Sequence, residues 1–385
     1  MNAYLLKNYM ENIAKYQKVC YNDRCKDICT YFIFGGIRIN TTTCERLDCF
    51  IDKYYSLHQN SGYLRITLKD EIIYERAIGF SDIENKVEFT KESMFTLYSL
   101  SKPFCAIGIL KLKDRGLVDI DNHPSIYLPE AKGFDERVTI RQLLHHVSGM
   151  PDFDQTARFK QKYASGFARQ MREHLKELSH YPMVFEPGTD AMYANVNFVV
   201  CALIIENVSG MKYAEYMKKE VFEPLGMVSA IVDDEDVIIK HRTKGYELMD
   251  GKIIPADRTL DWMLGAGDIV GTVDDVYCLN KAIKHRLMLK TDTWEEILTP
   301  SPLNSMGMGC TVSRWHEKRR ITHNGGSKGF RTLHIQLPED DFDIIFLSNS
   351  GWGNARKDIA DAIYEIYYGD KTVSGYDVKM DVGYI

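Results

Sequence analysis

Phe95-Thr-Leu-Tyr-Ser-Leu-Ser-Lys-Pro-Phe104 places a serine three residues before a lysine, where an apolar pattern with helical spacing begins. Pro103 suits the first turn of a helix, and Gly116 suits its end. In a helix that begins just after Ser99, the side chains of Ser99 and Lys102 project from one face of the first turn. A buried lysine has a lowered pKa and can take the proton of a serine hydroxyl. The segment therefore predicts a buried helix that presents Ser99 as a nucleophile and Lys102 as its proton-handling partner.

The S-x-x-K spacing alone is weak evidence, because a chain of this length contains such a pair by chance. A second match, Ser209-Gly-Met-Lys212, is interpreted as that accident, since Ser209 precedes Gly210 where a helix is expected to stop. For Ser99 itself, the alternative is a serine that caps a helix beside a solvated lysine. Further residues are needed to decide between the two readings.

Two later segments supply such residues. Tyr193 and Asn195 lie two apart, just before an apolar helical stretch, so both can face one cleft. A tyrosinate beside a lysine can act as a general base, and a carboxamide can bind both the lysine and a substrate amide. His323 and Gly325 lie on or beside a predicted edge strand, where glycine lets a ligand approach the backbone. These segments, in this order, favour a catalytic site.

The predicted elements give the fold class. Two hairpins with alternating apolar residues lie near the two ends of the chain, and segments with helical period dominate between Ser99 and Asp261. We therefore expect an α/β (α+β) fold with one mostly antiparallel sheet built from both termini, and an inserted helical lobe at about residues 105–260. The predicted strands are 64–68, 73–80, 333–337 and 344–347, and a terminal amphipathic helix includes Ile359, Ile363, Ile366 and Tyr367.

Three regions of the chain are expected. Residues 1–45 form a cysteine-rich extension in which Leu5, Tyr9, Ile13 and Tyr16 predict a short helix; residues 46–370 form the main domain, and 371–385 form a tail. Five of the nine cysteines fall within the first 50 residues, but their spacing fits no metal site, and histidine is absent from that stretch. We expect no metal and mostly free thiols.

Composition excludes several classes of protein. The 385 residues carry 48 Lys and Arg against 54 Asp and Glu, a formal net charge of −6, and 45% are hydrophobic. Such a chain is neither disordered nor fibrous, and it has no basic field for a nucleic acid. Its longest nearly uncharged apolar run, 198–205, is shorter than the roughly 20 residues of a membrane-spanning helix. The amino terminus lacks a secretory signal pattern, so a cytoplasmic location is expected; the oligomeric state is left open.

Taken together, the motifs resemble those of the serine β-lactamase and penicillin-binding-protein superfamily. The likeness is greatest to the branch of class C β-lactamases, D-alanyl-D-alanine carboxypeptidases, D-aminopeptidases and related esterases, and it covers roughly residues 48–368. The matching catalytic motifs are S-x-x-K at Ser99, Y-x-N at Tyr193 and H-x-G at His323. Similar framework segments are 139–151, 185–188, 222–227 and 265–275.

The resemblance implies a role for each motif residue. Ser99 would be the acylated nucleophile, Lys102 its proton-handling partner, and Tyr193 the base that activates first serine and then water. Asn195 would position the substrate amide. The backbone N–H groups of Ser99 and Gly326 would form the oxyanion hole. The expected cycle is acylation, release of the leaving group and hydrolysis, without a metal or an organic cofactor.

His323 and Gly325 form the third motif and are expected to bind substrate. Class C β-lactamases have lysine where this chain has His323, and a histidine is mostly neutral at pH 7. The sequence therefore favours a hydrolase of a small ester, amide or peptide over efficient β-lactam hydrolysis. The alternatives are a β-lactamase proper, a weakly catalytic or silent relative that binds a ligand or serves in assembly, and an enzyme that transfers the acyl group to another nucleophile.

Two other patterns are interpreted as structural. The sequence Gly325-Gly-Ser327-Lys-Gly329 satisfies the G-x-S-x-G motif of α/β-hydrolases, which requires a helix directly after the serine. Because residues 330–337 read as a strand, we expect Ser327 not to be a nucleophile. His145 and His146 have no metal-ligand spacing around them, so we expect both to be structural.

Overall fold

The computed structural model describes residues 33–34, 37–38, 41–153, 171–233, 238–256 and 263–368. The helix predicted around residues 5–16 and the tail 371–385 lie outside these ranges. The chain divides into two compact units, Met1–Asn60 with Gly353–Ser374, and Ser61–Trp352 with Gly375–Ile385. All predicted site residues belong to the second unit.

In the first unit, two helices pack against each other: α2 (Thr41–His58) and α11 (Ala355–Tyr368). The Tyr54 hydroxyl donates a hydrogen bond to Asp358 Oδ2 at 2.9 Å and so links them. Two short strands, β1 (Ile33–Phe34) and β2 (Ile37–Arg38), pair antiparallel. Helix α11 matches the predicted terminal helix. Helix α2 was not predicted, and the expected boundary at residue 45 falls inside it.

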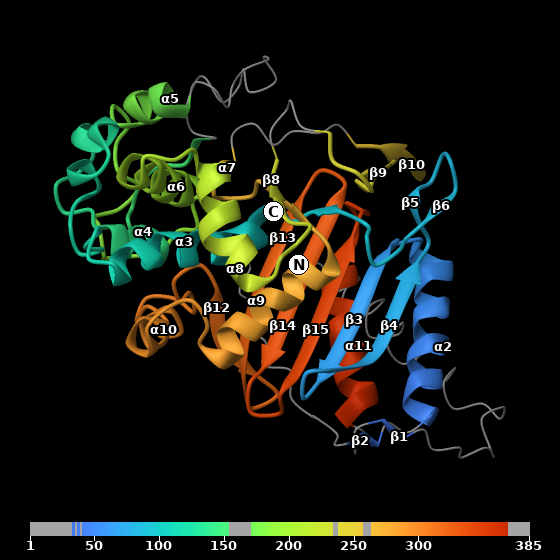
Figure 1. Cartoon of the computed structure of the whole chain (residues 1–385). Coiled ribbons are helices and arrows are strands. Elements are labelled where there is room, and N and C mark those ends of the chain that lie inside the picture. Colours follow the sequence, from blue (N-terminus) through green and yellow to red (C-terminus); the bar gives the residue numbers. More distant parts are fainter. Residues whose placement is uncertain are drawn as a thin grey trace, which may run out of the picture. The chain divides into compact units, whose positions relative to one another are not determined.

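The second unit contains a six-stranded antiparallel sheet in the order β12-β13-β14-β15-β3-β4 (Figure 1). Strand β15 pairs with β3, for example Ile344 with Ile66, so the sheet joins distant parts of the sequence as predicted. Both predicted hairpins are present, the first turning through Lys69 and Asp70 with positive φ. The strands are β3 (Gly62–Leu68), β4 (Glu71–Ile78), β12 (Thr311–Trp315), β13 (Lys318–Ser327), β14 (Phe330–Leu337) and β15 (Phe342–Ser348).

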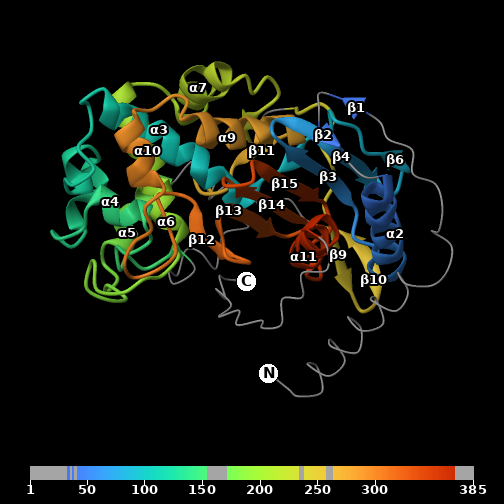
Figure 2. The ribbon, with the colours of Figure 1, turned by 90° about the horizontal axis from the view of Figure 1, so that it is seen from below.

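The core of the second unit contains two helices that are buried along most of their length and lie against each other, α3 (Lys102–Asp114) and α6 (Asn195–Ser209) (Figure 2). A single 3₁₀ turn, η1 (Tyr98–Ser101), leads into α3. Helix α6 ends at Gly210, whose φ of 70° suits glycine at that position. Both helices agree with the sequence pattern, because buried helices are apolar all round.

Helices occur both within and beyond the residues 105–260 expected for the helical lobe. Short strands also lie in that range: residues 246–255 form a local hairpin, and residues 231–232 pair with residues 269–270 of a three-stranded sheet. The remaining helices are α4 (Ile140–Leu144), α5 (Met171–Leu178), α7 (Tyr213–Tyr216), α8 (Glu223–Leu225), α9 (Val273–His285) and α10 (Thr291–Ile297); the helical turns are η2 (Pro124–Ile126), η3 (Pro129–Gly133) and η7 (Met217–Phe222). The remaining strands are β5 (Phe80–Asp82), β6 (Val87–Glu88), β7 (Phe95–Thr96), β8 (Ile231–Val232), β9 (Tyr246–Met249), β10 (Lys252–Pro255) and β11 (Ile269–Gly271).

Among the described helices, none is by itself long and apolar enough to cross a membrane. Helix α6 and the following segment Tyr213–Leu225 reach that length and composition only together, across a bend of 79°.

Candidate active site

Ser99 and Lys102 lie side by side, as their spacing predicts. Lys102 Nζ is 2.9 Å from Ser99 Oγ. The lysine side chain is completely buried, with 0% of its surface exposed, whereas Ser99 is half-buried. The structure therefore contradicts the alternative of a solvated lysine beside a capping serine. The nucleophile candidate can be reached from outside, and its basic partner cannot.

Three oxygen atoms surround the Lys102 amine. Besides Ser99 Oγ, Asn195 Oδ1 lies at 2.9 Å and the backbone oxygen of Ala266 at 2.7 Å. These two carbonyl oxygens can only accept hydrogen bonds, whereas the serine hydroxyl can also donate one. A neutral amine therefore directs its two hydrogens at Asn195 and Ala266 and leaves its lone pair facing the hydroxyl of Ser99. This is the arrangement that a proton transfer from serine to lysine requires.

Because Lys102 is buried, its amine is readily uncharged near neutral pH. Desolvation lowers the pKa of Lys102 to about 7, against the smaller opposing effects of the charges on Asp152, Cys105 and Asp268. A substantial fraction of the amine is then unprotonated near pH 7. An exposed lysine, with a pKa near 10.4, would be almost entirely protonated and could not accept the proton.

Tyr193 lies over the same amine. Lys102 Nζ is 4.6 Å from the centre of the tyrosine ring, close enough for a cation–π interaction when the lysine is charged. Burial raises the pKa of the Tyr193 phenol, although the neighbouring Ser99 side chain partly offsets this effect. The phenol is therefore protonated at neutral pH. It can relay a proton next to Ser99 rather than hold a negative charge in the resting site.

Asn195 is the first residue of α6, and a carboxylate that we did not predict holds it there. The backbone N–H groups of Asn195 and Val196 donate to Asp152 Oδ2 and Oδ1 at 2.8 and 3.0 Å. Asp152 thus caps α6 from a distant part of the chain, since Ala194, the residue at the N-cap, makes no side-chain cap. In the sequence, Asp152 directly follows the framework segment 139–151, but nothing local indicates which helix it caps.

A second unpredicted contribution comes from the framework segment 265–275. It supplies the Ala266 carbonyl to Lys102, and the Gly265 N–H donates to Asp268 Oδ2 at 2.9 Å. Burial raises the pKa of Asp268 to about 7. A backbone carbonyl carries no residue-type signal, so the sequence cannot reveal this partner of Lys102.

The two adjacent histidines have different surroundings. His145 Nδ1 lies 2.9 Å from the backbone oxygen of Met306, which is a structural contact. His146 stacks on the Tyr193 ring with the ring centres 4.3 Å apart, and its Nδ1 accepts a hydrogen bond from the Ala194 N–H. Desolvation lowers the pKa of His146 well below its usual value. This neutral ring packs against the face of Tyr193, so His146 lies nearer to the site than the sequence indicated.

The third motif, residues 323–325, contacts the turn that carries Ser99 through its backbone. Gly325 on β13 is packed so closely that a Cβ there would lie 1.9 Å from the Leu97 oxygen, two residues before Ser99. Thr332 on the neighbouring strand β14 donates to the same oxygen at 2.8 Å. His323 is buried, with Nδ1 2.7 Å from the Asn324 oxygen, and Gly326 is exposed. The structure thus packs the predicted H-x-G strand against the turn that carries Ser99.

Ser327, in contrast, has none of the features of a nucleophile elbow. It is the last residue of β13, and the chain turns directly into β14 rather than into a helix. Its backbone oxygen accepts a hydrogen bond from Arg331 Nη1 at 2.7 Å. The G-x-S-x-G match is therefore a feature of a hairpin turn, as expected.

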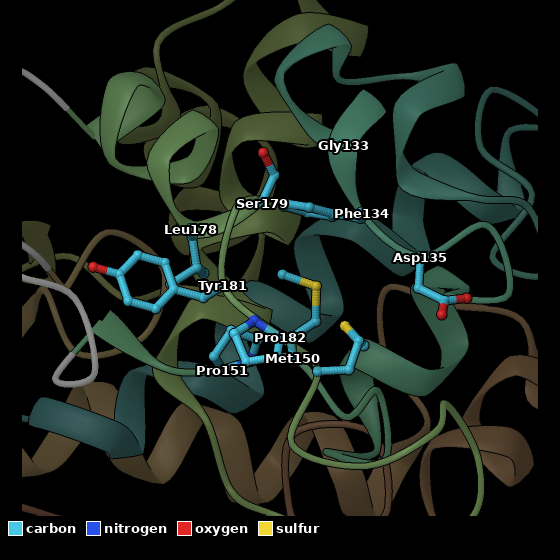
Figure 3. Close-up of a pocket in the computed structure, with 10 residues that line it drawn as sticks. Gly133, Phe134, Asp135, Met150, Pro151, Leu178, Ser179, Tyr181 and Pro182 are labelled. Atoms are coloured by element: carbon cyan, nitrogen blue, oxygen red, sulfur yellow. The ribbon is translucent and has the colours of Figure 1, made fainter.

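A cavity of about 250 Å³ lies elsewhere in the helical part of the second unit (Figure 3). It is lined by Gly133, Phe134, Asp135, Met150, Pro151, Leu178, Ser179, Tyr181, Pro182 and Met183. The predicted site residues are not among them. The cavity is therefore separate from Ser99, although Pro151 immediately precedes Asp152.

Comparisons with known proteins identify the family of the chain. The sequence model of the family described as Beta-lactamase matches residues 50–367. Penicillin-binding protein 4* of Bacillus subtilis (strain 168) is 29% identical over 314 residues, which cover 76% of this chain and 68% of the relative.

Two solved structures share the fold. The penicillin binding protein from Bacillus halodurans aligns with a TM-score of 0.72 at 23% identity, over 82% of this chain and 99% of its own. D-amino acid amidase from Ochrobactrum anthropi SV3, complexed with D-phenylalanine, aligns with a TM-score of 0.74 at 22% identity, over 85% and 99%. Since the family match spans most of the residues, this chain belongs to the Beta-lactamase family, related to the penicillin-binding proteins.

Proposed function

We propose that this protein is a serine hydrolase that cleaves a small ester or amide through an acyl intermediate on Ser99. The observation that carries the proposal is the Lys102 amine, which is buried, has its pKa lowered to about 7 and lies 2.9 Å from Ser99 Oγ. Complete burial disfavours the charged form of a lysine, and a base that must be uncharged to accept a proton benefits from that effect.

In the proposed cycle, Lys102 takes the hydroxyl proton as Ser99 Oγ attacks the substrate carbonyl. The negative charge that develops on the carbonyl oxygen is stabilised by the backbone N–H groups of Ser99 and Gly326. Collapse of the tetrahedral intermediate breaks the bond to the leaving group, which takes a proton from Lys102 by way of the Tyr193 phenol. Water then attacks the acyl-serine with the proton movements repeated, and Ser99 is regenerated.

The resting protonation state modifies the role expected for Tyr193. The sequence suggested a tyrosinate base, but burial raises the pKa of this phenol whereas it lowers that of Lys102. We therefore assign the first proton transfer to Lys102 and the relay to Tyr193. Two groups whose pKa values are pushed in opposite directions divide acid and base work in this way.

The substrate class is proposed from chemistry and from relatives. The Asn195 amide oxygen contacts the Lys102 amine beside Ser99, where the resemblance gives this residue the role of positioning a substrate amide, and one structural relative is named a D-amino acid amidase. His323 stands where a lysine would attract a substrate carboxylate, which disfavours β-lactams. We propose small amides or esters, D-amino acid amides included, as better substrates than β-lactams.

The test is a hydrolysis screen with p-nitrophenyl esters of short acids, D- and L-amino acid amides and nitrocefin. Wild type is compared with Ser99→Ala and with Ser327→Ala as the matched control, and intact mass after a fluorophosphonate probe locates the acylated serine. We expect turnover and labelling in wild type and Ser327→Ala but neither in Ser99→Ala. Labelling that survives Ser99→Ala, or a wild type that neither labels nor turns over any substrate, would refute the proposal.

A further inference from the structure

Asp152 is held rigidly at the site by the segment that precedes it. Gly149 has a φ of 70°, and a Cβ there would lie 2.1 Å from the Phe185 oxygen. Only glycine therefore fits at this position. The Ser148 hydroxyl donates to Asn197 Oδ1 on α6 at 2.8 Å, and the Met150 N–H donates to Ser148 Oγ at 3.3 Å. These contacts fix the position of Asp152 against the first turn of α6.

The carboxylate of Asp152 orients the Asn195 side chain as well as its backbone. Asp152 Oδ2 accepts from the Asn195 N–H at 2.8 Å and lies 3.4 Å from Asn195 Nδ2. The amide nitrogen thus faces the carboxylate, and the amide oxygen faces Lys102 Nζ at 2.9 Å. A carboxylate can only accept hydrogen bonds, so it disfavours the flipped amide, in which two oxygens would face each other.

We propose that Asp152 is a positioning residue of the active site, whose carboxylate holds the Asn195 amide toward Lys102 and whose charge sets how readily Lys102 gives up and takes its proton. The inference rests on the proposed function, because it assumes that Lys102 is the base for Ser99. It adds a residue that lies outside the S-x-x-K, Y-x-N and H-x-G motifs.

The charge effect is specific because few charged groups face Lys102. From the described elements around it, Lys102 interacts with Asp152, Asp268 and Cys105, all of which favour the charged lysine, and with the neutral rings of His146 and Tyr193. Asp152 has the largest effect of the three acidic groups. Removing its charge should therefore make Lys102 a weaker base.

The experiment measures the rate of acylation of Ser99 between pH 5 and pH 9 in Asp152→Asn. We expect the rise of the rate with pH to move about one pH unit lower, because an opposite charge typically shifts a neighbouring pKa by about one to three units. We also expect the plateau, the pH-independent acylation rate reached at high pH, to fall roughly tenfold, because a weaker, less well oriented base transfers the proton more slowly. Asp152→Ser, which keeps a capping oxygen without the charge, should shift the curve equally and serves if Asp152→Asn does not fold.

Asp275 provides the matched control. Its buried carboxylate caps α9, accepting from the Thr272 N–H at 2.9 Å, and it is not among the groups that act on Lys102. Asp275→Asn should lower the melting temperature but leave the pH curve in place. In an Asn195→Ala background, Asp152→Asn should still shift the curve but cause little further loss of the plateau, which separates the charge effect from the positioning effect.

An unchanged curve and plateau in both Asp152 variants, with Ser99 still acylated, would overturn the inference and leave the proposed function standing. A wild type that is never acylated at Ser99 would instead refute the proposed function itself. An equal shift of the curve in Asp275→Asn would show that the loss of a helix cap, rather than the charge beside Lys102, causes the effect.

Discussion

The same S-x-x-K pattern occurs twice in this chain, and the two copies differ in almost every physical respect. Ser99 precedes a core helix, and Lys102 is fully buried with three oxygen partners. Ser209 is the last residue of α6, its hydroxyl accepts a hydrogen bond from the Met211 N–H at 3.2 Å, and Lys212 is exposed. The second copy is thus the helix-end turn that the sequence suggested.

The comparison shows that burial, rather than spacing, makes the motif chemically competent. Desolvation lowers the pKa of Lys102 to about 7, and carbonyl oxygens from two other segments direct its lone pair toward Ser99. An exposed lysine remains charged at neutral pH and has no lone pair to offer.

The largest expected effect separates the two lysines. Lys102→Ala should lower the acylation rate by about 10²- to 10⁴-fold, the usual contribution of a positioned proton acceptor. Lys212→Ala should leave the rate unchanged, because that side chain is exposed. Stopped-flow acylation with an activated ester measures both. Equal rates in the two variants would remove the distinction between the copies.

The second effect concerns the Tyr193 phenol beside the first copy. Tyr193→Phe keeps the ring over Lys102 but removes the proton relay, so we expect acylation to slow by about 10²-fold. Tyr216→Phe is the control, since its buried hydroxyl donates to the Gly108 oxygen at 3.0 Å. It should lose about 1 kcal/mol of stability without a change in rate. A Tyr193→Phe enzyme as fast as wild type would exclude the relay.

The third effect is a pH dependence. Acylation requires the neutral amine, so below the Lys102 pKa of about 7 the rate should fall about tenfold for each pH unit. Burial also raises the pKa of Asp268 to about 7, so its titration could cause a fall of the rate over the same pH range. If Lys102 is responsible, Asp268→Asn should keep this fall, moved slightly to lower pH because a negative charge near Lys102 is lost. Disappearance of the fall in Asp268→Asn would assign it to the aspartate.

The smallest effect concerns the second copy alone. Ser209→Ala removes the hydroxyl that accepts a hydrogen bond from the Met211 N–H. Loss of this hydrogen bond should lower the free energy of unfolding by about 0.5 to 1.5 kcal/mol. Chemical denaturation should detect this loss, and the acylation rate should stay at the wild-type value. A slower rate at unchanged stability would mean that Ser209 takes part in the reaction.

The sequence alone sufficed for the elements whose signals are local. The hairpins predicted at 64–80 and 333–347, the helix after Ser99 and the stop at Gly210 follow from side-chain period and turn residues, and all are present. Helix α2 was not predicted, although Leu47, Ile51 and Tyr54 lie in it at helical spacing and are buried, because the expected boundary at residue 45 divided its sequence. The helix expected around residues 5–16 remains a prediction.

The motif positions were also readable from the sequence, because the chemistry of serine, lysine, tyrosine and asparagine belongs to the residue type. Their partners were not: Asp152, the Ala266 carbonyl and the ring of His146 reach Asn195, Lys102 and Tyr193, respectively, only in the folded chain. Desolvation and hydrogen-bond direction depend on what surrounds an atom, and those neighbours come from segments up to 164 residues apart. The sequence therefore determined which groups could react. The tertiary structure decided the protonation state of each group and the atom that it faces.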